Sequence, residues 1–154
     1  MANTHTLLSQ HHWKGVELAE LVRRQLVPNG TDANTTISGP KVVLSVRAAQ
    51  VLAMVLHELV TNAAKHGGLS TPHGRVEVTW EFGRPEGPAN VLIEWRELGG
   101  PAVAGSPEYK YGVSIIRHII PQELGGSVKL AFPSDGVCCK IEIPLEPARS
   151  ETQA

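Results

Sequence analysis

Hydrophobic residues at helical spacing mark the middle of the chain. Between Ser45 and His66 they recur every three or four positions, a pattern typical of one face of an α-helix. Ser45 is suited to cap the start of this helix, and Gly67-Gly68 to end it. The apolar arc consists of Leu52, Val55, Leu56, Leu59, Val60 and Ala63, with Ala53 and Ala64 at its margins. We therefore predict a helix over 45–66 that packs against a hydrophobic core.

Other segments of the chain predict two shorter helices and six strands. One helix runs from Val16 to Leu26, before Pro28-Asn29-Gly30, and another begins near Tyr111-Gly112 and ends by Gly125-Gly126. Pro121 lies inside the second helix and should kink or shorten it. Runs of β-forming or alternating residues predict strands at Thr35–Ser38, Val42–Ser45, Arg75–Phe82, Val91–Glu97, Ser127–Phe132 and Val137–Pro144.

The order of these elements predicts an α+β fold. Hairpins replace regular βαβ alternation, which favours a two-layer α/β sandwich with a mixed, mostly antiparallel sheet and helices on one face. We expect a flexible N-terminal segment at 1–13, one folded domain at 14–146 and a disordered tail at 147–154. The sequence has no Gly-Lys-Ser or Gly-Lys-Thr, which excludes a Walker A phosphate loop.

Composition narrows the class of protein. The 154 residues carry a formal net charge of -1, so the chain lacks the basic excess expected of a nucleic-acid-binding protein. No apolar run is long enough to span a membrane and no signal peptide is visible, so we expect a cytoplasmic protein. The two cysteines, Cys138 and Cys139, are neighbours in a strand and point to opposite faces, which argues against a disulfide between them.

The polar arc of the long helix carries the candidate chemistry. It collects His57, Glu58, Thr61, Asn62, Lys65 and His66. A carboxylate, an amide oxygen and an ammonium group side by side can hold Mg²⁺ through oxygen ligands and water, and can neutralise phosphate charge. The alternative is a solvated helix surface with one or two ion pairs. Asn and Thr are mediocre helix formers, which favours the functional interpretation.

Three segments together resemble a known family. HELVTNAAKHG at 57–67 resembles the N-box of the Bergerat-fold ATPases. Trp95-Arg96-Glu97 followed by Gly99-Gly100-Pro101, and the ending ELGGSVKL…GVCCKIEIPL, are similar to the HWE subgroup of sensor histidine kinases. The resemblance runs from about Leu7 to Leu145. It implies that residues 14–146 form an ATP-binding catalytic domain with the Bergerat fold.

The resemblance assigns roles on the long helix. Asn62 matches the residue that coordinates Mg²⁺, and Glu58 matches an acidic residue that orients a metal-bound water. Lys65 and His66 match positions beside the phosphates and the ribose. For His57 the resemblance leaves two interpretations open, a nucleotide contact or a structural histidine at the edge of the apolar arc.

The resemblance also assigns residues outside that helix. Glu97 matches the carboxylate that accepts the adenine amino proton, and Gly99 and Gly100 would let the backbone approach the base. Gly112 would place free N–H groups of a helix start near a phosphate. Cys138 falls where many relatives have a threonine beside adenine.

Besides Cys138, two features depart from the family pattern. The second glycine box usually reads Gly-aromatic-Gly but here is Lys110-Tyr111-Gly112, so we expect Lys110 to supply a charge where the family has a flexible glycine. Pro121 interrupts a helix that is usually continuous. The segment between the glycine boxes, about 102–111, is short, as in the HWE subgroup.

The implied function is that of a sensor histidine kinase catalytic domain. It would bind ATP with Mg²⁺ and transfer the γ-phosphoryl group to a histidine on a separate helical hairpin, which then supplies a response regulator. No histidine of this chain lies in a phospho-acceptor motif, so the chain alone should not phosphorylate itself. The alternatives are a free-standing anti-sigma-factor-type serine kinase and a degenerate docking module of the same fold. We expect no nucleic-acid or membrane partner for this segment.

Overall fold

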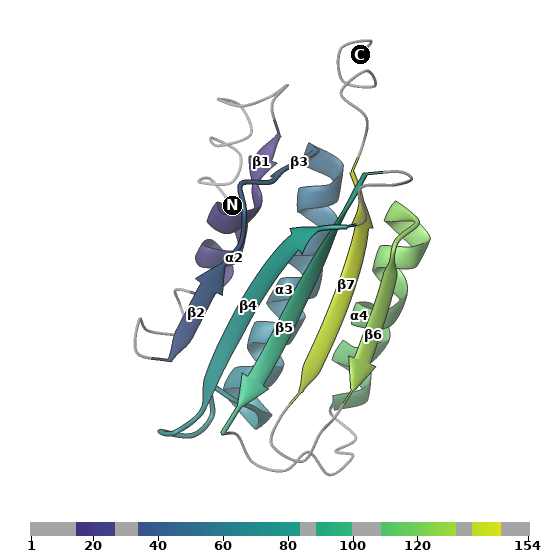
Figure 1. The fold of residues 1–154 in the computed structure, drawn as a ribbon. Coiled ribbons are helices and arrows are strands. Elements are labelled where there is room, and N and C mark those ends of the chain that lie inside the picture. Colours follow the sequence, from purple (N-terminus) through teal and green to yellow (C-terminus); the bar gives the residue numbers. More distant parts are fainter. Residues whose placement is uncertain (1–14, 27–33, 84–88, 100–108, 132–136, 146–154) are drawn as a thin grey trace.

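A five-stranded sheet forms one layer of the protein (Figure 1). The computed structural model describes residues 15–26, 34–83, 89–99, 109–131 and 137–145. Its elements are β1 (Val16–Glu17), α2 (Leu18–Leu26), β2 (Thr35–Ser38), β3 (Val43–Leu44), α3 (Val46–His66), β4 (Arg75–Phe82), β5 (Asn90–Leu98), α4 (Tyr109–Leu124), β6 (Ser127–Ala131) and β7 (Cys138–Pro144). The strand order is β2-β4-β5-β7-β6, with β2 parallel to β4 and every other neighbouring pair antiparallel.

The helices form the second layer, on one face of this sheet (Figure 1). α3 crosses behind the central strands, between α2 and α4. α3 and α4 run in opposite directions. Arg47 near the start of α3 forms an ion pair with Glu123 near the end of α4, at 2.9 Å. The start of α4 therefore lies beside the end of α3. This arrangement confirms the predicted two-layer α+β sandwich.

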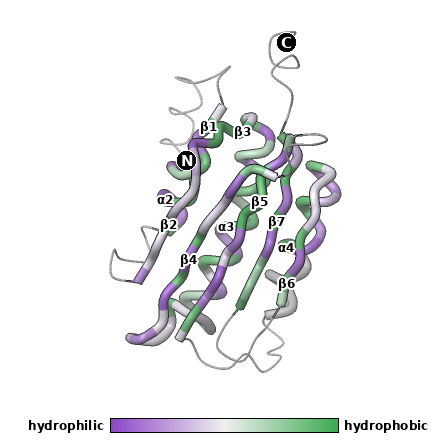
Figure 2. The backbone as a smooth tube through the Cα atoms, viewed as in Figure 1, coloured by the Kyte–Doolittle hydropathy of each residue, from purple (hydrophilic) through white to green (hydrophobic). Residues whose placement is uncertain are grey.

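The core lies between the two layers. Buried and exposed residues alternate along β4, β5 and β7, and the same alternation is visible in their hydropathy (Figure 2). Trp95 is fully buried on the helix-covered face, opposite Val78 and Cys139. Arg96 points to the open face, where it lies opposite Cys138. Trp95 and Arg96 therefore lie on opposite faces of the sheet.

The ends of the helices differ from the predictions in small ways. Ser45 caps α3 as predicted, with its Oγ accepting a hydrogen bond from the Ala48 N–H at 3.1 Å. α2 begins two residues later than predicted, because β1 pairs with β3 before the helix starts. α4 is not shortened at Pro121 but continues to Leu124, where Gly125 with a φ of +70° follows. Pro121 lacks the N–H of one i→i−4 hydrogen bond, and only three helical residues follow it before the helix ends.

Two further sequence predictions concern the ends of the chain and membranes. The segments 1–13 and 147–154 lie outside the described residues. Within the described residues, no helix is both long and apolar enough to cross a membrane.

Candidate functional site

The end of α3 and the end of β5 are joined by one carboxylate. Glu97 lies on the helix-covered face of β5, and its Oε1 accepts a hydrogen bond from the Gly68 N–H at 3.0 Å. Its Oε2 accepts a second bond from the Trp95 indole N–H at 2.9 Å. Two segments that are 29 residues apart in sequence therefore meet at this side chain. The predicted adenine-binding position is thereby placed directly beside the predicted N-box helix.

Burial gives this carboxylate unusual electrostatics. Glu97 is 1% exposed, and desolvation raises its pKa above the ordinary 4.5, while the bonds from Trp95 and Gly68 lower it. Bonds to a charged carboxylate are stronger than neutral ones, so the two donors favour the ionised form that burial disfavours. A ligand can therefore contact the Glu97 carboxylate only if the groups that cover this side chain move apart.

Glycines make the close approach possible. A Cβ at Gly67 would lie 2.0 Å from Glu97 Oε1, and one at Gly68 would lie 2.7 Å from the Arg75 carbonyl oxygen. Gly99 has a φ of +71°, and a Cβ there would lie 2.6 Å from the His73 carbonyl oxygen. The turn between α3 and β4 is thus packed against the end of β5 with no room for side chains at these positions.

Three predicted residues share one side of α3. At about 100° per residue, Glu58, Asn62 and Lys65 fall within roughly 60° of each other. Lys65 is 18 residues after Arg47, a whole number of turns, so it points to the same side as the residue that contacts α4. Because α4 starts beside the end of α3, this polar side faces the start of α4. Asn62 is 8% exposed, whereas Lys65 is exposed and Glu58 half-buried.

Several predicted residues do not join this group. His57 is exposed and lies about 140° around α3 from Asn62, so it points to a different side of the helix. Cys138 lies on the open face of the sheet, 3.6 Å from Glu94 Oε2, and cannot contact a base beside Glu97. The structure therefore contradicts the expected position of Cys138 beside the base, because Cys138 points to the face opposite Glu97, whereas Cys139 points to the face of Glu97.

Other predicted residues are only partly described. The backbones of His66, Lys110 and Gly112 lie in α3 and α4, with Gly112 the fourth residue of α4. Gly100 lies outside the described residues, and so does the 102–108 part of the short segment between the glycine boxes.

The donor set suits magnesium bound together with phosphates. No group of three or more His, Cys, Asp or Glu side chains in the described ranges could hold a metal by itself. Mg²⁺ is commonly held by one or two protein oxygens together with water and phosphate oxygens. Asn62 on α3 carries an amide oxygen of the kind that serves as such a ligand, and the residue is 8% exposed.

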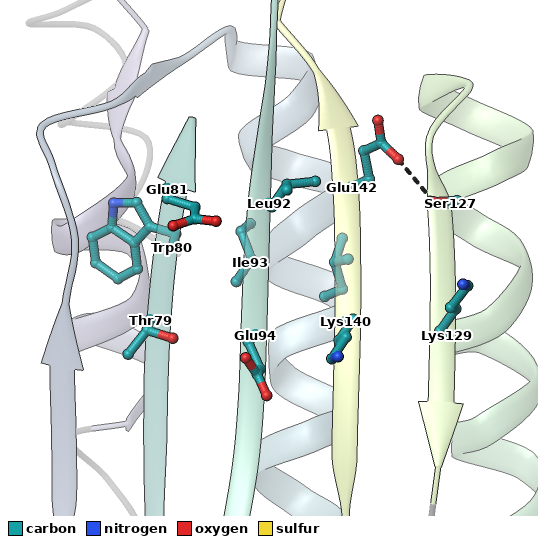
Figure 3. Close-up of a pocket in the computed structure, with 11 residues that line it drawn as sticks. Thr79, Trp80, Glu81, Leu92, Ile93, Glu94, Ser127, Lys129, Lys140 and Glu142 are labelled. Carbon is teal, nitrogen blue, oxygen red and sulfur yellow. Dashed lines mark hydrogen bonds between the residues drawn. The ribbon is translucent and has the colours of Figure 1, made fainter. Parts of the chain in front are cut away.

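A shallow groove of about 420 Å³ lies elsewhere, on the open face of the sheet (Figure 3). Its polar lining includes Glu94 and Glu142 beside Lys129 and Lys140, and Ser127 donates a hydrogen bond to Glu142 at 3.4 Å. The mixture of carboxylates and ammonium groups does not favour binding of a polyanion such as a nucleoside triphosphate. The sheet separates this groove from Glu97, so the groove is not the candidate nucleotide site.

Sequence reasoning missed two contributors to the site. Trp95 was not among the predicted site residues, yet this buried side chain donates a hydrogen bond to Glu97. Its position two residues before Glu97 was the available signal, because residues i and i+2 share one face of a strand. No sequence signal identifies the Gly68 N–H as a donor, because every residue except proline carries a backbone N–H.

Known proteins similar to this chain are histidine kinases. Residues 1–41 match the family model described as HWE histidine kinase. A blue-light-activated histidine kinase of Rhizobium johnstonii is 34% identical over 144 residues, covering 94% of this chain and 41% of that protein. A blue-light-activated histidine kinase of Brucella ovis is 28% identical over 149 residues, covering 96% of this chain and 30% of that protein. The chain therefore spans less than half the length of these curated relatives.

Solved structures agree on the fold. The catalytic domain of histidine kinase ThkA matches with a TM-score of 0.58 at 24% identity, covering 85% of this chain and 95% of that one. The fold is thus the one seen in histidine kinase catalytic domains. Within that class, the chain is a relative of the HWE histidine kinases, as the sequence predicted.

Proposed function

We propose that this chain is the ATP-binding catalytic domain of a sensor histidine kinase. It binds ATP with Mg²⁺ between α3 and α4, and the γ-phosphoryl group passes to a histidine on a separate helical hairpin. The histidine kinase relatives and the shared fold support this proposal. A response regulator as the later acceptor and a cytoplasmic location stay predictions.

The observation that carries the proposal is the meeting of two kinds of group at one end of the helix layer. Glu97 supplies a buried carboxylate acceptor at the end of β5, bonded to the turn that follows α3. Glu58, Asn62 and Lys65 supply a carboxylate, an amide and an ammonium group on the side of α3 that faces α4. An adenine nucleotide needs an acceptor for its amino group and, farther along, metal-holding and cationic groups for its phosphates.

Each side chain then has a defined task. The Asn62 amide oxygen would hold Mg²⁺, and the Glu58 carboxylate would orient a water beside it. Lys65 neutralises phosphate charge that develops during transfer, because an exposed ammonium on a long stem can reach a phosphate oxygen. Glu97 accepts a hydrogen bond from the adenine amino group. Mg²⁺ itself supplies electrostatic stabilisation of the phosphoryl group.

The remaining assignments extend the same site. His66 follows Lys65 at the end of α3, beside the ribose. Gly99 and Gly100 bring the backbone close to the base, and Gly112 brings the first turns of α4 close to a phosphate. Lys110 adds a positive charge at the start of α4.

Calorimetry tests the proposal with one variant and a matched control. Asn62→Ala should remove the Mg²⁺-dependent part of the affinity for a non-hydrolysable ATP analogue, a loss of at least about tenfold. Gln50→Ala removes an exposed amide from the same helix, about 18 Å away along its axis, and should leave the affinity unchanged. Equal effects of the two variants would contradict the assigned role of Asn62.

The same measurement separates the alternatives. A docking module of this fold predicts no binding of ADP or ATP analogue even at millimolar ligand. Incubation with labelled ATP and Mg²⁺ should give no phosphorylated chain, and adding a helical hairpin that carries an acceptor histidine should give phosphohistidine. Acid-stable phosphoserine on an added protein would favour the anti-sigma-factor-type kinase instead.

A further inference from the structure

The indole of Trp95 holds one oxygen of Glu97. Trp95 is fully buried and lies two residues before Glu97 on the same face of β5. We propose that Trp95 is a positioning residue, whose N–H fixes the Glu97 carboxylate in the orientation that distinguishes adenine from guanine. This inference rests on the proposed function and deepens it, because it assigns the base selectivity of the site to a residue that need not touch the nucleotide.

The first step is the hydrogen-bonding capacity of Glu97. An ionised carboxylate has about four lone-pair sites, and the protein uses one on each oxygen, from Gly68 at 3.0 Å and from Trp95 at 2.9 Å. The remaining lone-pair sites can accept a hydrogen bond from a ligand only in directions that these two bonds determine. Adenine presents an amino donor where guanine presents a carbonyl acceptor, so a fixed carboxylate acceptor favours adenine.

The second step is that little else holds the carboxylate in this orientation. The terminal torsion of a glutamate is broad and roughly two-fold, so one hydrogen bond alone leaves the group able to rotate. The backbone of Gly67 limits movement on the Oε1 side, since even a Cβ there would come within 2.0 Å of that oxygen. On the Oε2 side, the Trp95 N–H is the donor that the described residues provide. Removing it frees that oxygen.

The third step concerns the protonation state. Burial raises the pKa of Glu97, and the Trp95 bond lowers it, so losing that bond raises the pKa further. On neighbouring β7, Cys139 is the titratable group near Glu97 in the described structure, and its pKa of about 12 keeps it neutral near pH 7. Val76 on β4 and the glycines after α3 bring no charge. A protonated Glu97 loses acceptor capacity, so nucleotide affinity should fall on acidification. Without the indole, this fall should begin at a higher pH.

The chain offers a matched control in a second tryptophan. Trp80 is 5% exposed in the same sheet, and its indole N–H donates to the Pro40 carbonyl oxygen at 2.7 Å, outside the candidate site. Phenylalanine at either position keeps an aromatic ring but removes the indole donor. A general loss of packing should affect both variants, whereas a positioning role should affect only one.

The test compares affinities for ATP and GTP analogues over a range of pH. Trp95→Phe should reduce the preference for adenine about tenfold, as expected for a lost hydrogen bond to a charged group, and should shift the acidic loss of affinity to higher pH. Trp80→Phe should change neither the preference nor the pH profile. Equal preferences and profiles in the two variants would overturn the inference. Absence of ATP binding by the unsubstituted protein would instead refute the proposed function.

Nuclear magnetic resonance gives a second readout that does not depend on the folding of Trp95→Phe. The protein has three tryptophans, so Trp13→Phe and Trp80→Phe assign all the indole N–H signals. In the unsubstituted protein, the Trp95 signal should titrate with pH and move when ATP analogue is added, and Glu97→Gln should abolish the titration. The Trp80 signal should do neither. A Trp95 signal that ignores both pH and nucleotide would refute the positioning role.

Discussion

Replacing Gly67 by alanine probes the contact between α3 and β5. The backbone at Gly67 has a φ of −126°, outside the left-handed region that favours glycine, so the predicted cost of alanine is the space that its Cβ needs. The added Cβ would lie 2.0 Å from Glu97 Oε1 and 3.2 Å from the Ala63 Cα. The carboxylate must move, because a real Cβ cannot remain that close to an oxygen.

The cost follows from what the carboxylate loses. Overpacking of a buried site costs about 1–3 kcal/mol. Moving Oε1 away from the Gly68 N–H adds about 1.5–3 kcal/mol for a hydrogen bond to a charged group. The lower conformational entropy of unfolded alanine returns about 0.4–1 kcal/mol. We therefore expect Gly67→Ala to lower the free energy of unfolding by about 3 kcal/mol.

Urea unfolding of a double-mutant cycle tests this reasoning. If Glu97 is the obstacle, Gly67→Ala should cost little in a Glu97→Ala background, giving a coupling energy of about 2 kcal/mol or more. Gly125→Ala is the control: a Cβ there meets nothing within 4 Å, but its φ of +70° should cost about 1–2 kcal/mol in either background. Additivity of Gly67→Ala and Glu97→Ala within about 0.5 kcal/mol would refute the proposed clash.

Two other predictions concern stability. Ser45→Ala should lower the free energy of unfolding by about 1 kcal/mol, because it removes the cap on the Ala48 N–H. The control Ser38→Ala, at an exposed position, should change this free energy by less than about 0.5 kcal/mol. Similar losses for the two variants in urea unfolding would contradict the role of Ser45 as a cap. Burial raises the pKa of Cys139 from 9.0 to about 12, so the folded state keeps a proton that the unfolded state loses in this range. Stability should therefore fall between pH 9 and 12, by up to about 4 kcal/mol, and an equally steep fall in Cys139→Ala would exclude this thiol as the cause.

Local patterns in the sequence were enough to predict most elements and the polar side of α3. The bounds of β2 and β4 and the Ser45 cap agree with prediction, because strand alternation and capping depend on residues close in sequence. The grouping of Glu58, Asn62 and Lys65 follows from helical spacing alone. The resemblance to HWE histidine kinases rested on the same short segments, and the comparisons confirm it.

Only the tertiary structure decided how those segments meet. Gly67 ends the helix as predicted, but the reason for glycine there is not a left-handed φ. Its small size is needed because Glu97 from a distant strand packs against it. Strand register placed Cys139, not Cys138, on the face of Glu97. A change of one residue in register would exchange the two cysteines between the faces, because neighbouring side chains in a strand point to opposite faces. The bonds from Trp95 and Gly68 to Glu97 likewise depend on the pairing of layers, which no local pattern specifies.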